Sequence, residues 1–187
     1  ISTSTASPVS LSGTIQAHLK YTVNVANGFG FASSGTAKIF VDNSYQYTIS
    51  STDAVFTCGG SRCQVDGTFI ISGGAHGVGY QPDFMDINNQ MTVTGTADKI
   101  FTEIDIYGTL TIHSGSSVHW QDITNFVDGT GVVDISGELS IEGEVDVIGT
   151  FNVKSGGILY VSWPTGASVL TFGICGILNI ETGGQLV

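Results

Sequence analysis

The C-terminal half of this 187-residue chain is built from four units of one pattern. Each unit has a glycine, then an apolar, a polar and an apolar residue, then a short turn of small residues, and then a second apolar pair. This alternation is that of a half-buried β-strand. Such short strands gain a core only by stacking on copies of themselves, as in a solenoid. The units are IYGTLTIHSGSSVHW, ISGELSIEGEVDV, VIGTFNVKSGGILYV and ICGILNIETGGQLV, led by Gly108, Gly137, Gly149 and Gly176.

The same alternation predicts which side chains point into the core. The spacing of the leading glycines predicts a coil of roughly 20 to 30 residues per turn, with two or three short strands in each. The stretches QDITNFVDGTG (121–131) and SWPTGASVLTF (162–172) are expected to be loops at one corner. The predicted inward residues are Leu110, Ile112, Val118, Trp120, Leu139, Ile141, Val145, Val147, Phe151, Val153, Leu159, Val161, Leu178, Ile180 and Leu186.

The N-terminal part of the chain shows alternation in stretches of unequal length. From Ile15 to Val25 the odd positions are apolar and the even positions polar, which predicts one long strand. No stretch has the periodicity of an amphipathic helix. We therefore expect an all-β chain with an irregular β-rich part over 1–65 and solenoid coils over 66–187, forming one continuous domain. A β-sandwich of antiparallel hairpins is the alternative, because it produces the same alternation.

These units resemble the right-handed parallel β-helix of pectin-lyase-like and adhesin-like surface proteins, in which G-x-L-x-I, a short turn and x-L-x-V recur in coil after coil. The resemblance covers residues 101–187 well and residues 66–100 poorly. Its motif describes stacking and not chemistry. The resemblance implies an extracellular protein that is displayed on a surface or associated with carbohydrate.

Charge excludes two classes of partner. The formal net charge is -11, with only five lysines and arginines, so the chain has little with which to neutralise nucleic-acid phosphates. Anionic membrane surfaces are disfavoured for the same reason. No apolar run reaches the length of a transmembrane helix, so we expect no membrane insertion.

Three cysteines allow a local disulfide and one further thiol. Cys58 and Cys63 bracket CGGSRC, whose glycines let the chain fold back far enough for a disulfide, which would imply an oxidising compartment. A metal clip is the rival interpretation, but the chain lacks a second pair of cysteines or histidines at zinc spacing. Cys175 aligns with Tyr107, Ser136 and Ile148 of the other units, an outward or corner position, so it is a candidate for a bond between chains. A buried free thiol is the alternative.

Enzymes of the resembled families need particular charged residues close together, and this sequence has few candidates for them. The resemblance implies that an enzyme of the lyase type would have a calcium site of clustered carboxylates beside a basic residue. Arg62, the only arginine, lies inside CGGSRC, where such a pairing is hard to build. The hydrolase type needs converging carboxylates, for which Asp83 and Asp86 are the nearest candidates, with His76 upstream. Loop carboxylates are more often turn formers. We predict no catalytic residues.

One acidic stretch is a candidate for calcium. In EGEVDV, Glu142, Glu144 and Asp146 fall on or beside one outward face, and oxygen ligands at this density suit calcium. A solvated wall that keeps the sheet soluble explains the same pattern, and the spacing lacks the known calcium motifs, so no cofactor is expected. His113 and His119 also point outward, as exposed residues or as a metal pair.

The last unit ends without a polar cap, a helix or a charged final strand. Such an end exposes unpaired backbone and apolar side chains, so it must meet another copy, another domain or a truncation point. Leu186 and Val187, with Cys175, are therefore predicted intermolecular contacts.

These observations predict a non-enzymatic, extracellular or cell-surface structural protein that stacks on itself or on neighbouring surface proteins in a filament, sheath or layer. One alternative is a β-helix that binds or cleaves carbohydrate, with Tyr80, Trp120 and Trp163 lining a groove. Another is a fragment of an adhesin whose binding head is missing.

Overall fold

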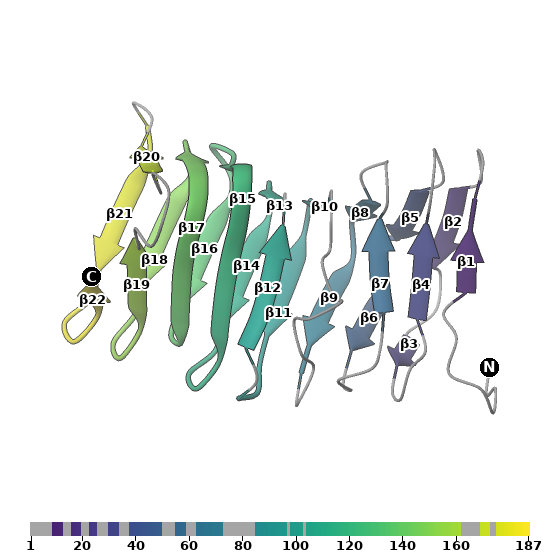
Figure 1. Ribbon diagram of the computed structural model, residues 1–187, viewed down its shortest axis with the longest axis horizontal. Coiled ribbons are helices and arrows are strands. Elements are labelled where there is room, and N and C mark those ends of the chain that lie inside the picture. Colours follow the sequence, from purple (N-terminus) through teal and green to yellow (C-terminus); the bar gives the residue numbers. More distant parts are fainter. Residues whose placement is uncertain are drawn as a thin grey trace.

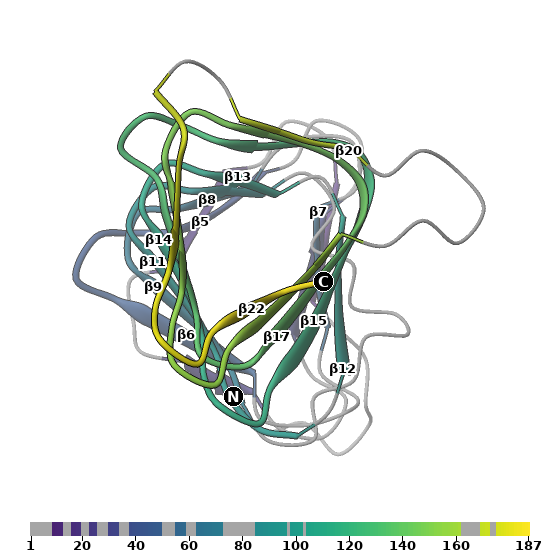
Figure 2. The same ribbon diagram turned by 90° about the vertical axis from the view of Figure 1, so that its left-hand side faces the viewer.

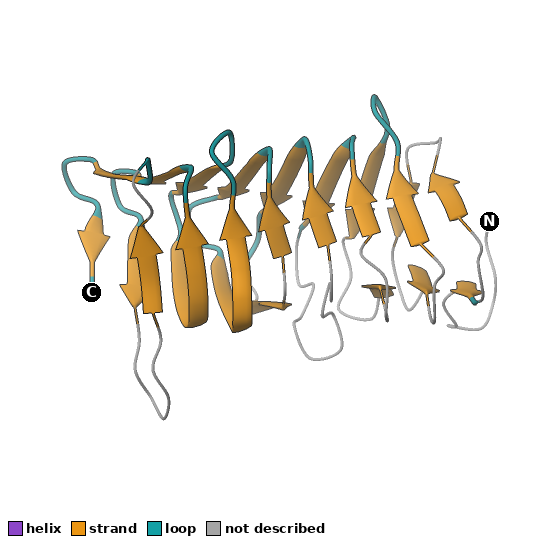
Figure 3. Ribbon diagram, turned by 90° about the horizontal axis from the view of Figure 1, so that it is seen from above, coloured by secondary structure: helices purple, strands orange, loops and turns teal. Residues whose placement is uncertain are grey.

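The computed structural model is all-β, with parallel strands stacked as a β-solenoid (Figure 1). It describes residues 9–12, 16–19, 23–25, 30–33, 38–49, 55–58, 63–72, 85–96, 98–102, 104–161, 169–172 and 175–187. Strands and turns make up these residues, and no helix occurs among them (Figure 3). Every strand pair in them is parallel, which excludes the β-sandwich alternative, because hairpins pair antiparallel.

The strands form three sheets along the solenoid, and the view down its axis shows the chain winding round a closed outline (Figure 2). One face is a sheet of eight strands, whose inner strands are each hydrogen-bonded to the strand one turn before and the strand one turn after. In spatial order these are β3 (Val23–Val25), β6 (Gln46–Ile49), β9 (Thr68–Ile71), β11 (Gln90–Val93), β14 (Thr109–Ile112), β16 (Val132–Ile135), β18 (Thr150–Val153) and β21 (Ile177–Ile180).

The rest of the wall is an eleven-stranded sheet and a three-stranded sheet. The three-stranded sheet is β1 (Val9–Leu11), β4 (Gly30–Ser33) and β7 (Val55–Cys58). The main path of the larger sheet is β2 (Gln16–Leu19), β5 (Lys38–Val41), β8 (Cys63–Val65), β10 (Met85–Ile87), β13 (Ile104–Ile106), β15 (Ser117–Val127), β17 (Glu138–Val147), β19 (Ile158–Val161) and β22 (Gln185–Leu186). Beside this path, β12 (Asp98–Thr102) pairs with β15, and β20 (Val169–Phe172) pairs with β17.

The length of a turn varies along the solenoid. Val133 pairs with Phe151, 18 residues later, and Phe151 pairs with Leu178, 27 residues later. The predicted 20 to 30 residues per turn is therefore close to what the ladders show. The strands keep their register while the corners between them absorb the difference.

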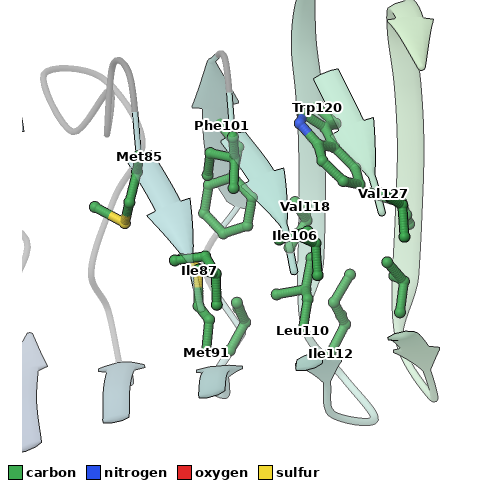
Figure 4. Close-up of a cluster of buried hydrophobic side chains, with 14 of the residues drawn as sticks. Met85, Ile87, Met91, Phe101, Ile106, Leu110, Ile112, Val118, Trp120 and Val127 are labelled. Carbon is green, nitrogen blue, oxygen red and sulfur yellow. The ribbon is translucent and has the colours of Figure 1, made fainter. Parts of the chain in front are cut away.

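The core is a stack of side chains from successive turns, with like positions in register (Figure 4). Aromatic rings stack within it, as Tyr47 does on Phe69 with ring centroids 5.4 Å apart. The inward residues predicted in the first three units are fully buried, except Val161, which is half-buried. The last unit differs, since Leu178 only partly packs on the core while Ile180 is 46% exposed.

The second unit was wrongly aligned with the others. Leu139 pairs with Val118 and Leu159 in the eleven-stranded sheet, whereas Leu110 and Phe151 lie in the eight-stranded sheet. The unit ISGELSIEGEVDV therefore begins one corner later than the other units. Two faces carry the same alternation and both corners carry glycine, so the pattern alone does not tell them apart.

Two predicted elements have different boundaries in the structure. The expected single strand from Ile15 to Val25 is two strands, β2 and β3, which belong to different sheets. The expected loop 121–131 is largely strand, because β15 continues to Val127 with an irregularity between Asp122 and Asn125. Apolar and polar residues can go on alternating where the chain bends from one face to the next. The alternation therefore does not show where a strand ends or where it continues.

Hydrogen-bonded ladders also cross residue 65, where the sequence suggested a boundary. Val65 on β8 pairs with Ile87 on β10, and Tyr47 on β6 pairs with Phe69 on β9. The strands on either side of this position thus share the same two sheets. Among the described residues, no helix is long and apolar enough to cross a membrane.

Candidate functional site

One end of the eight-stranded sheet is the edge strand β21, which has a partner only on its β18 side among the described strands. Ile180 on β21 continues the column of Val153, but it is 46% exposed where Val153 is fully buried. Leu186 on β22 likewise continues the column of buried Leu159 and is 50% exposed. The predicted contact residues Leu186 and Val187 therefore lie at an apolar, open edge.

The other end of this sheet is β3, which pairs only with β6 in the part of the chain that the structure describes. Following the ladder along the sheet brings Val23, Asn24 and Val25 into the same register positions as Leu178, Asn179 and Ile180. The two edge strands thus share one sequence pattern, an asparagine between two apolar residues.

An asparagine ladder runs along the outside of the sheet to the β21 edge. Asn179 Nδ2 donates to Asn152 Oδ1 at 2.9 Å, and Asn152 Nδ2 donates to Asp134 Oδ1 at 2.8 Å. Stacked amide side chains of this kind stabilise parallel in-register strands. The ladder ends at an exposed residue, Asn179, on the open edge.

Lys154 ties the last turns together beside this ladder. Its Nζ lies 3.3 Å from Glu181 and 3.5 Å from Asp134. The hydrogen bond to Glu181, and then the charge of Asp134, raise the pKa of Lys154. A raised pKa means that the bridge stabilises the folded state below the ordinary lysine pKa, and that this contribution is lost as the pH rises through the raised value.

Cys175 is free and exposed, so the structure excludes the buried-thiol alternative. It occupies the corner before β21, as Tyr107 and Ile148 occupy the corners before β14 and β18. Ser136 was wrongly grouped with them, because it follows β16 at another corner.

Cys63 is fully buried on β8, while the side chain of Cys58 lies outside what the structure describes, so their pairing stays a prediction.

The acidic stretch on β17 is only partly described. His119 Nδ1 and Glu142 Oε1 lie 3.1 Å apart, so Glu142 faces a histidine of the neighbouring strand. Asp146 is exposed, and the side chain of Glu144 is outside the described set. Within the described residues no group of three His, Cys, Asp or Glu side chains could hold a metal. His113 is exposed in a turn, away from the inward face.

The candidate residues for catalysis or carbohydrate binding are described only in part. His76, Tyr80, Asp83 and Trp163 lie outside the described residues, and Asp86 lies on β10. Trp120 is fully buried in the core, so it does not line a surface groove as suggested. Its inward position follows from the alternation of β15.

A polar hollow, which the sequence did not suggest, lies at the corner between the larger sheets. It has a volume of about 810 Å³ and is open to solvent. We call it the corner hollow, and it is lined by Asp42, Asn43, Tyr45, Asp66, Asn88 and Asn89. These residues are far apart in the sequence and meet only because three successive corners stack.

Comparison of the chain with protein-family models, curated proteins and solved structures found no match. The parallel ladders and the in-register core nevertheless define its class. The chain is a β-solenoid protein.

Proposed function

We propose that this β-solenoid is a non-enzymatic structural protein of the cell surface or extracellular space, and that its copies stack end to end in a filament, sheath or layer. The observation that carries the proposal is the match between the two edge strands of the eight-stranded sheet. β3 reads VNV and β21 reads ILNI, and their asparagines hold the same register position.

A second copy fits the β21 edge better than an unrelated strand would. If β3 of that copy paired in parallel with β21, Val23 and Val25 would take the register positions next to Leu178 and Ile180. Asn24 would take the register position next to Asn179. Burying an exposed isoleucine side chain stabilises by roughly 1.5–3 kcal/mol. The contact is head to tail, and such contacts form open filaments when their rotation does not close a ring.

Electron microscopy of the natively purified protein tests this proposal, and we expect regular filaments. Ile180→Asp is expected to abolish them, because it places a carboxylate in the apolar part of the joint. Ile148→Asp is the matched control, since Ile148 is 39% exposed at a corner and away from the edge strands.

Filaments should persist in the Ile148→Asp variant, and circular dichroism should show both variants folded. Dispersed wild-type particles would overturn the assembly proposal. Filaments that survive Ile180→Asp unchanged would overturn the proposed joint.

The proposed extracellular location draws on the predicted Cys58–Cys63 disulfide, because disulfides persist in oxidising compartments. Its support is the spacing CGGSRC, whose glycines let Cys58 and Cys63 approach each other, and the burial of Cys63, while Cys175 is free. We expect maleimide labelling of the dispersed protein, unfolded without reductant, to modify one cysteine of the three, Cys175. Labelling after reduction should modify all three. Three labelled cysteines without reductant would contradict the disulfide and remove its support for an oxidising compartment.

A further inference from the structure

We propose that the corner hollow is a binding site for a neutral or amino oligosaccharide. The hollow lies one turn in from the β3 edge and shares no residue with the proposed joint between copies. The proposal therefore does not depend on assembly.

The hollow exists because one corner is wider than the corners that follow it. Four residues, 42–45, connect β5 to β6, whereas two residues connect β8 to β9 and two connect β10 to β11. The wide turn stands out beyond the next corners (Figure 2). It includes Ser44 with a φ of 70°, a conformation that is uncommon for a residue other than glycine.

Backbone hydrogen bonds hold the three corners in line. The amides of Asp66 and Gly67 both donate to the Val41 carbonyl at 2.9 Å, and the amide of Asn88 donates to the Val65 carbonyl at 3.0 Å. The first corner residue of each turn, Asp42, Asp66 or Asn88, therefore lies directly beyond the one before it. The strand spacing of about 4.8 Å gives the row a length of about 10 Å.

The groups in the hollow match the hydroxyl groups of a sugar. Asp42 and Asp66 supply carboxylate acceptors, while Asn43, Asn88 and Asn89 supply amides that both donate and accept. Asp66 Oδ1 already accepts from Asn88 Nδ2 at 2.8 Å, which positions both groups. Tyr45 adds a half-buried ring with an apolar face and a polar hydroxyl, and a pyranose ring presents the complementary C–H face.

The charge of the hollow selects among saccharides. Among the described residues, its lining has two carboxylates and neither lysine nor arginine. The nearest described group that can carry positive charge is His18, whose Nδ1 lies 2.7 Å from Asp42 Oδ1 and whose ring stacks on Phe40. Uronic and sulfated sugars are therefore repelled, whereas neutral and amino sugars are accepted.

A metal ion is the competing occupant for a site with carboxylates. The corner hollow offers two of them, and calcium sites ordinarily take six to eight oxygen ligands with several from carboxylates. Amides and a tyrosine ring make up the rest of the lining, which suits a sugar better. Calcium therefore enters the test as a separate arm.

The test is binding of the wild-type protein to an array of neutral, amino and uronic oligosaccharides, followed by calorimetry with the best ligand and with calcium chloride. We expect a neutral or amino oligosaccharide to bind. Tyr45→Ala and Asp66→Asn should each weaken its binding at least tenfold. The amide introduced by Asp66→Asn keeps an oxygen that can accept from Asn88 Nδ2, so this variant is expected to stay folded.

Asp128→Asn is the matched control, because Asp128 occupies the same corner position two turns beyond Asn88 and lies outside the hollow. Its binding should equal that of the wild type. Absence of binding to all neutral and amino sugars, preference for uronic sugars, or equal loss in the control would overturn the proposal. Calcium binding that depends on Asp66, without sugar binding, would also overturn it. If Asp66→Asn fails to fold, Tyr45→Ala alone decides.

Discussion

Replacing Trp120 with alanine is expected to lower the free energy of unfolding by about 3–5 kcal/mol, the usual loss for a large buried aromatic side chain. Trp120 is fully buried, and its ring stacks on Phe151 across the core with centroids 6.5 Å apart. It lies on β15 between Phe101 of β12 and Ile141 of β17. Its removal would leave a cavity that spans adjacent turns.

Replacing Trp120 with phenylalanine separates packing from hydrogen bonding. The indole Nε1 of Trp120 is buried and has no hydrogen-bond partner among the described residues, and an unsatisfied buried donor costs about 1–3 kcal/mol. Phenylalanine removes this donor and keeps most of the ring, so its loss of stability should be much smaller than that of alanine. Urea unfolding followed by far-ultraviolet circular dichroism measures both. An alanine variant within about 1 kcal/mol of the wild type would show that the core is looser than the structure indicates.

Replacing Gly137 with alanine is expected to cost about 3 kcal/mol, at the upper end of the range for overpacking. A Cβ at this position would overlap the backbone carbonyl oxygens of Ser116 and His113 in the preceding turn. Backbone atoms in hydrogen-bonded ladders cannot move aside as a flexible side chain can. Gly108, Gly149 and Gly157 meet backbone carbonyls in the same way.

Gly129→Ala is the control for this prediction. A Cβ on Gly129 would meet only the Ile148 side chain, at 3.8 Å, which is ordinary contact. Its stability should stay within about 1 kcal/mol of the wild type. Thermal unfolding of the two variants gives the comparison, and equal melting temperatures would refute the argument that corner glycines set the spacing between turns.

Much of this architecture was predictable because its causes are local. The alternation around Leu110, Leu139 and Phe151 identified the inward side chains, and all three are fully buried. Gly108, Gly137 and Gly149 marked corners, where the preceding turn leaves no room for a side chain.

The corner hollow was not predictable, since nothing in the sequence relates Tyr45 to Asn89. They meet because Val41, Val65 and Ile87 stack in one column, which places three corners side by side. The cue that was available is the wider connection DNSY beside the short connections DG and NN. Its meaning depends on knowing that these connections are neighbours.

The sequence by itself determined that the chain is a stack of short β-strands with glycine corners, because alternation and corner sterics act between residues close in the chain. Only the tertiary structure decided which strand pairs with which. It split Ile15 to Val25 between two sheets, moved Leu139 to a different sheet from Leu110, and brought Asn24 and Asn179 to the two edges of one sheet in matching register. The physical reason is that parallel pairing joins residues about 20 positions apart, and backbone hydrogen bonds are the same for every sequence. The choice among registers is therefore made by how the whole core packs.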